Sequence, residues 1–165
     1  MNVQPCVVSL LLFHLWSWSP AAAQQRPTPY QPEDPELYCT FFRAHSALDQ
    51  QFQAGTASPG TTLASTASLY HISLDDLPKL TTEVRKFMTG LVAWEAQVQA
   101  YVAKQRAAKQ LPDMKVMIDF QVQRQRLVIA THSQVHQALT PVSWSGLGAY
   151  IKGDYRRSLA TGGGK

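Results

Sequence analysis

The sequence contains few cysteines and few asparagines. Of its 165 residues only Cys6 and Cys39 are cysteine, and only Asn2 is asparagine. If the chain is cleaved after Ala23, one thiol remains and no disulfide can form within the mature chain. This argues against the disulfide-framed folds of many small secreted toxins, growth factors and inhibitors. The loss of Asn2 also removes any N-glycosylation acceptor.

The motifs of common catalytic and cofactor sites are also lacking. There is no C-x-x-C-H haem attachment, phosphate-binding loop or dinucleotide glycine fingerprint. Around Ser145, the two positions that a nucleophile elbow requires to be glycine are Ser143 and Leu147. We therefore expect a protein that is not an enzyme and holds no cofactor.

Long apolar runs are absent as well. Residues 6–16 (CVVSLLLFHLW) are mostly apolar, but a helix that spans a membrane needs about 20 such residues. Residues 17–23 (SWSPAAA) end in three alanines, as a signal-peptidase site requires, although residues 1–5 contain no Lys or Arg. We expect a signal peptide over residues 1–23, export to the periplasm or the extracellular space, and no transmembrane segment in the mature chain.

Basic residues are scarce in the first part of the mature chain, and acidic residues are outnumbered by basic ones in the second part. Residues 24–78 hold two basic and six acidic groups, and residues 79–165 hold thirteen basic and five acidic groups, so the net charges are −4 and +8. This asymmetry favours attraction between the two parts within one fold. Binding of an anionic partner by the second part is the alternative.

Apolar residues recur with the period of an α-helix along most of the mature chain. Residues 24–35 (QQRPTPYQPEDP) have four prolines and no such period, which predicts an extended linker. Asp34 is suited to cap a helix that begins at Pro35, and Gly55 is suited to end it. The stripe expected to face the core consists of Leu37, Phe41, Ala44, Leu48 and Phe52.

A long third helix is predicted after a short second one. Residues 63–70 favour a helix, with a strand as the alternative, and Ser73 and Asp76 resemble a capping box. The third helix has Pro78 near its start and Gly90 beside its seam, where a small residue permits close helix approach. Its apolar seam consists of Leu80, Val84, Phe87, Leu91, Trp94, Val98 and Tyr101.

A fourth helix and a short last one complete the prediction. Pro112 follows the basic end of the third helix, where a fourth helix can begin. Residues 114–139 carry a broad apolar arc, and Pro141 ends this fourth helix. Four to five helices joined by short loops predict an all-α, single-domain bundle over residues 36–158. A flexible tail is expected over residues 159–165.

Two histidines are the candidate metal ligands. His132 and His136 lie four residues apart on one helix face, so both could bind one Zn²⁺ or Cu²⁺, with His45 and His71 converging from elsewhere. A zinc-protease motif is not present because residue 133 is Ser. His132 also lies within the apolar arc, so the alternative is an imidazole that is hydrogen-bonded in or beside the core.

Cys39 is the second candidate. It lies opposite the apolar stripe of its helix and one turn before Arg43, so we expect a solvent-accessible thiol with a lowered pKa. The interpretations are a redox thiol, a disulfide that joins two chains as a homodimer, or an incidental or partly buried cysteine. His45 points to a different side of the helix, which disfavours cysteine hydrolase chemistry.

The third candidate is a basic aromatic surface. Such a surface could bind anionic lipid, polysaccharide or nucleic acid, although export disfavours nucleic acid, and a solvated face is the alternative. Its residues are Arg124, Arg126, Lys152, Arg156 and Arg157, with Tyr150 and Tyr155.

These patterns predict an exported, non-catalytic interaction or structural protein. Its partner is expected to be an unknown protein or an anionic component of the cell envelope. The alternative function is that of a metal-binding periplasmic helical protein that uses His132 and His136.

Overall fold

The fold is all-α, as the sequence predicts, in a computed structural model that describes residues 34–162. The expected signal peptide and nearly all of the expected linker lie outside these residues. None of the helices in the described range is long and apolar enough to cross a membrane. In chain order the elements are α1 (Pro35–Gln53), α2 (Leu63–Leu69), α3 (Leu77–Ala107), α4 (Met114–Ala138), α5 (Pro141–Tyr150), the π-helix η1 (Ile151–Tyr155) and α6 (Arg156–Gly162).

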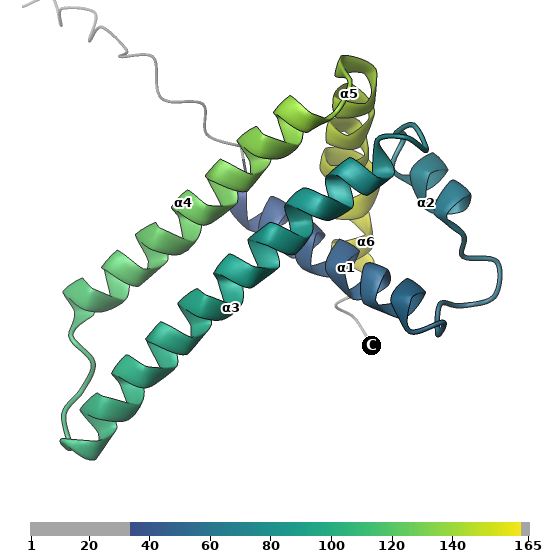
Figure 1. Cartoon of the computed structure of the whole chain (residues 1–165). Helices are drawn as coiled ribbons and strands as arrows, with labels where there is room; N and C mark the ends of the chain where they lie inside the picture. The colour runs from purple at the N-terminus through teal and green to yellow at the C-terminus, as the bar shows by residue number, and fades with distance from the viewer. Residues whose placement is uncertain (1–33, 163–165) are drawn as a thin grey trace, which may run out of the picture. The chain divides into compact units, whose positions relative to one another are not determined.

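The two longest helices, α3 and α4, form an antiparallel hairpin (Figure 1). α1 crosses this hairpin, and the continuous run of α5, η1 and α6 packs against α1. The buried residues of α3 end at Leu91, and those of α4 begin at Val128. The core therefore lies at the end of the hairpin away from its connecting loop, and two helices alone make up the other end.

Close contacts hold the hairpin together along its length. A Cβ at Gly90 would lie 3.0 Å from the Leu127 side chain, so the glycine permits the close approach that the sequence analysis expected. Trp94 donates a hydrogen bond from Nε1 to the Phe120 carbonyl at 2.9 Å. The first four residues of the predicted α3 seam are buried, and the last three, Trp94, Val98 and Tyr101, are half-buried.

The ends of α1 are as predicted, but its buried face is broader. Asp34 accepts a hydrogen bond from the Leu37 amide, Pro35 is in the first turn, and Gly55 follows with a φ of 67°. The predicted stripe is wrong at Ala44, which is exposed. Because α1 touches α3 and α4 as well as η1, more of its circumference is enclosed. Its buried residues are Leu37, Tyr38, Cys39, Phe41, Phe42, His45 and Ser46.

Phe41 lies at the centre of an aromatic cluster. Its ring is 1% exposed and lies within 6.2 Å, centroid to centroid, of Tyr70, Tyr150 and Tyr155. A π-helix is wider than an α-helix and bonds residues five apart, so η1 brings Tyr150 and Tyr155 nearer to one side than an α-helix would. The π-turn therefore adapts the C-terminal helix to the Phe41 ring.

Asp76 joins the start of α3 to the start of α5. Its buried carboxylate accepts hydrogen bonds from Lys79 Nζ at 2.7 Å and from the Thr140 hydroxyl at 2.7 Å and amide at 3.2 Å. Burial opposes ionisation, but these bonds and one from Ser143 outweigh it and hold the pKa of Asp76 well below its usual value. Only half of the expected capping box forms. Ser73 Oγ accepts a hydrogen bond from the Asp76 amide, but the Asp76 carboxylate accepts from Thr140 instead of from the Ser73 amide.

Ion pairs join the acidic and basic parts of the chain, as the sequence analysis favoured. Arg85 binds Asp49, Arg124 binds Glu36, and Arg156 binds Asp34. Each pair links α1 or its cap to a later helix. At the other end, α6 includes residues 159–162, so this part of the predicted tail is helical.

α2 is a helix and not the alternative strand, and its end is pressed against α5. His71 has a φ of 56°, and the amides of His71 and Ile72 bond to the carbonyls of Ser68 and Ala67 in a Schellman motif. A Cβ at Gly146 would lie 2.1 Å from the His71 carbonyl oxygen. The backbone of α5 therefore approaches this turn more closely than any side chain would allow.

The Gly146→Ala substitution should strongly destabilise the protein. The added methyl group meets a backbone atom that cannot rotate away, so α5 must shift, and we expect a loss of about 1–3 kcal/mol. The matched control is Gly148→Ala in the same helix, where nothing lies within 4 Å. This control should be neutral or stabilising by up to about 1 kcal/mol. Urea unfolding of both variants gives the comparison, and equal stabilities would contradict the described contact.

Candidate functional site

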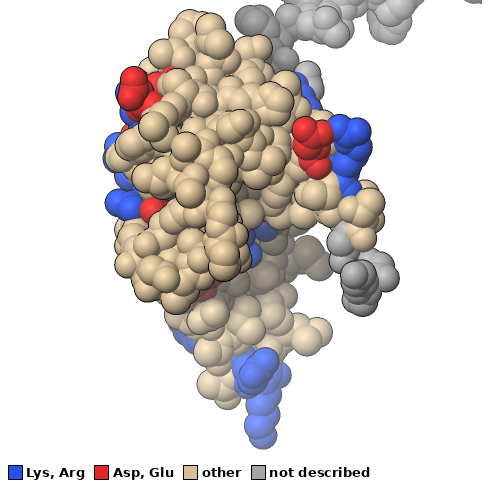
Figure 2. Space-filling view, turned by 90° about the vertical axis from the view of Figure 1, so that its right-hand side faces the viewer, with Lys and Arg blue, Asp and Glu red and all other residues tan. Residues whose placement is uncertain are grey.

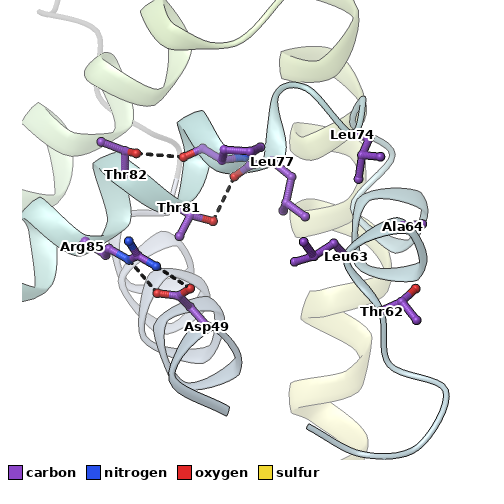
Figure 3. A pocket seen from close by; sticks show the side chains of 10 residues that line it. Asp49, Thr62, Leu63, Ala64, Leu74, Leu77, Thr81, Thr82 and Arg85 are labelled. Atoms are coloured by element: carbon purple, nitrogen blue, oxygen red, sulfur yellow. Dashed lines mark hydrogen bonds and ion pairs between the residues drawn. The ribbon is translucent and has the colours of Figure 1, made fainter. Parts of the chain in front are cut away.

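A groove lies between α2 and the first turns of α3 (Figure 3). It has a volume of about 690 Å³. Leu63 and Ala64 of α2 form one wall, and Leu77 and Pro78 of α3 form another. Leu74, from the turn between the helices, also lines the groove. These five side chains form an apolar wall, and the other lining residues are Asp49, Thr62, Thr81, Thr82 and Arg85.

The wall at α2 depends on a short helix that is capped at its start. Thr62 and Ser65 form a capping box, in which the Thr62 hydroxyl accepts from the Ser65 amide and the Ser65 hydroxyl from the Thr62 amide. These bonds compensate for the low stability of a seven-residue helix. They fix the direction in which Leu63 projects into the groove.

The surface around the groove carries almost no charge. Residues 54–74 contain no Asp, Glu, Lys or Arg. Figure 2 shows this side of the molecule, where charged residues gather at the margins. Leu63 and Leu74, which both line the groove, are each 55% exposed. Neighbouring exposed leucines on an uncharged surface are typical of an interaction site.

An ion pair closes one end of the groove. Arg85 donates from Nε and Nη2 to the two carboxylate oxygens of Asp49, at 2.7 and 2.8 Å. The hydrogen bond from Arg85 holds the pKa of Asp49 below its usual value. Because the two charges compensate each other, this end of the groove offers no net charge to a ligand.

His45 lies beneath the groove. Its Nε2 is 3.0 Å from Thr81 Oγ1, and its Nδ1 is 3.4 Å from the Tyr70 hydroxyl. Thr81 donates its own proton to the Leu77 carbonyl, so its oxygen accepts from Nε2–H of His45. Burial lowers the pKa of His45 to about 4. The imidazole is therefore neutral, and the Thr81 hydroxyl it contacts is not activated as a nucleophile.

The candidate metal ligands His132 and His136 both lie against one indole. The His132 and His136 rings are each 4.7 Å from the Trp144 ring, and the His132 ring is 4.4 Å from that of Tyr38. Burial lowers the pKa of His132 to about 4. Within residues 34–162 no three His, Cys, Asp or Glu side chains are grouped as a metal site requires. His45 and His71 contact tyrosines instead.

The expectation of an accessible Cys39 thiol is wrong. Cys39 is 5% exposed, because α1 is enclosed on more than one side. Burial raises the pKa of the thiol, and the nearby Arg124 and Arg43 only partly oppose this. A buried thiol with a raised pKa does not suit redox exchange or a disulfide between chains.

The basic aromatic surface is not assembled as expected. Tyr150 and Tyr155 are buried against Phe41 rather than exposed. Arg124 and Arg156 pair with acidic residues at the start of α1. These arginines stabilise the fold, which leaves less free positive charge for an anionic partner.

Sequence reasoning missed the groove because the lining residues come from separate segments. Leu63 lies on α2, which ends at Leu69, and Leu74 lies in the turn that follows, so no single helix carries both residues. The one available signal is the absence of charge over residues 54–74.

No known protein family, curated protein or solved structure matches the chain.

The free energy of unfolding should fall as the pH falls from about 6.5 to about 4. His132 has a folded-state pKa of about 4, so the unfolded state binds more protons in this window. The loss is about 1.4 kcal/mol for each pH unit per histidine, and His45 adds to it in the same direction. Urea unfolding at several pH values should show that the free energy of unfolding changes less steeply with pH for His132→Phe than for wild type. Equal slopes would contradict the burial of a neutral His132.

Proposed function

We propose that the protein is an exported, non-catalytic interaction protein that binds an apolar helical segment of another protein in the α2–α3 groove. The observation that carries this proposal is the uncharged surface of residues 54–74, with exposed leucines beside an aliphatic groove. An amphipathic helix that inserts apolar side chains into such a groove is a common mode of recognition.

The shape of the groove supports a macromolecular partner. Two of its lining residues, Leu63 and Leu74, are more than half exposed. A small ligand is usually enclosed over 70–90% of its surface, roughly, which requires walls on more sides. One face of a helix fits an open groove, and its outer face stays in solvent.

The chemistry around the groove supports a binding role rather than a catalytic one. The Thr81 and Thr82 hydroxyls donate to backbone carbonyls, and Arg85 is engaged by Asp49. These groups offer a ligand hydrogen-bond acceptors but no activated nucleophile. Export rests on residues 1–23, whose apolar run and three alanines are typical of a signal peptide.

Replacement of Leu63 should abolish binding of a helical peptide. The probe is a displayed library of amphipathic helices of about 15 residues, from which binders to the wild-type chain are selected. Leu63→Asp places a carboxylate in the aliphatic wall, and we expect affinity to fall by at least about tenfold. Fluorescence anisotropy with a selected peptide measures this change.

The matched control is Leu69→Asp. Leu69 lies on the same helix and has the same exposure of 55%, but it does not line the groove. Its variant should bind the peptide as wild type does, and both variants should keep their stability within about 0.5 kcal/mol because the positions are exposed. The proposal is wrong if no helical peptide binds, or if both substitutions weaken binding equally.

The expected cleavage has its own test. When the full chain is expressed in a bacterial host, the exported form should begin at Gln24, as shown by intact mass and N-terminal sequencing. A protein that keeps residues 1–23 in every cell fraction would refute the export proposal but not the groove.

A further inference from the structure

An apolar stripe runs along one flank of α4 near the hairpin tip. Met114, Ile118 and Val122 follow one another at spacings of four residues, so their side chains share one face of the helix. They are 72%, 54% and 38% exposed. Ile129, half-buried, continues the same flank. The stripe is distinct from the α2–α3 groove.

The side of α4 roughly opposite this stripe is already occupied by α3. Phe120 packs against Tyr101 with ring centroids 5.8 Å apart, and Leu127 lies against Gly90. Further along α4, the flank that carries the stripe is covered, since His132 lies between Tyr38 and Trp144. The stripe is therefore the uncovered continuation of a face that packs elsewhere in the fold.

The charges beside the stripe are self-complementary. Asp119 and Arg126 lie seven residues apart, so they share one edge of the stripe. Neither takes part in an ion pair among the described residues, although seven other acidic residues there do: Asp34, Glu36, Asp49, Asp76, Glu83, Glu95 and Asp154. In antiparallel helices the same edges of the two helices meet. Opposite charges on one edge therefore suit an antiparallel pairing with an identical helix.

We propose that this stripe is the contact surface between two copies of the chain, related by a two-fold axis at the level of Gln121 and Val122. About this axis Met114 lies opposite Ile129 of the second copy, and Ile118 lies opposite its Gln125. At a rise of 1.5 Å per residue, Asp119 lies about 3 Å along the helix axis of α4 from the level of Arg126 in the second copy. An arginine side chain easily covers this offset.

The first test is a charge within the stripe. Sedimentation velocity of the mature wild-type chain should show a dimer, with or without reductant because Cys39 is buried. Ile118→Glu should raise the dimer dissociation constant by at least about 100-fold. The matched control is Val142→Glu on α5, a position that is 81% exposed and lies off the stripe, and it should leave the dimer unchanged. Both variants should keep the wild-type circular dichroism spectrum.

The second test is a charge exchange. Asp119→Arg and Arg126→Asp should each weaken the dimer by about tenfold, because like charges then meet across the axis. The double variant Asp119→Arg/Arg126→Asp should restore wild-type affinity, which a structural role or a different partner would not produce. A monomer at every concentration tested, a dimer that survives Ile118→Glu, or a double variant that fails to recover would overturn the proposal.

Discussion

The fold depends on the burial of Phe41 at the point where three segments meet. Its ring contacts Tyr70 at the end of α2 and Tyr150 and Tyr155 at the π-turn. Full burial of such a ring contributes about 2–3 kcal/mol, and each aromatic contact adds about 0.5–1.5 kcal/mol. Since α2 buries only Thr66 and Ala67 within its own length, its position depends on Tyr70 and the turn that follows. The groove wall therefore depends on the same contact.

Polar contacts then fix the direction of the helices that the aromatic cluster brings together. Asp76 ties the start of α3 to the start of α5, and the ion pairs of Arg85, Arg124 and Arg156 tie α1 to later helices. Surface ion pairs contribute little stability each, about 0–1 kcal/mol. The Asp76 carboxylate is different because it is buried and fully hydrogen-bonded. It sets the geometry at the end of the bundle where the groove lies.

Helix positions could be predicted from the sequence, because caps and apolar periods are local signals. Asp34, Pro35 and Gly55 mark α1 correctly, and the α3 seam is correct as far as its buried part extends. The exposure of Cys39 could not be predicted, because it depends on how many neighbours enclose α1. A period identifies one apolar face but cannot show that a second face is also covered. The π-turn was equally hidden, since nothing local distinguishes η1 from regular helix.

The groove and the α4 stripe lie at opposite ends of the hairpin, and this separation gives the two surfaces compatible roles. The groove uses the first turns of α3, whereas the stripe lies beside the last turns of α3, roughly 25 Å further along its axis. An antiparallel pairing through the stripe places the two grooves at the far ends of the assembly. Two equal sites on one particle gain avidity for a partner that presents its helical segment repeatedly. A modest affinity of each open groove is then sufficient, because the second contact forms within an assembly that the first has already brought together.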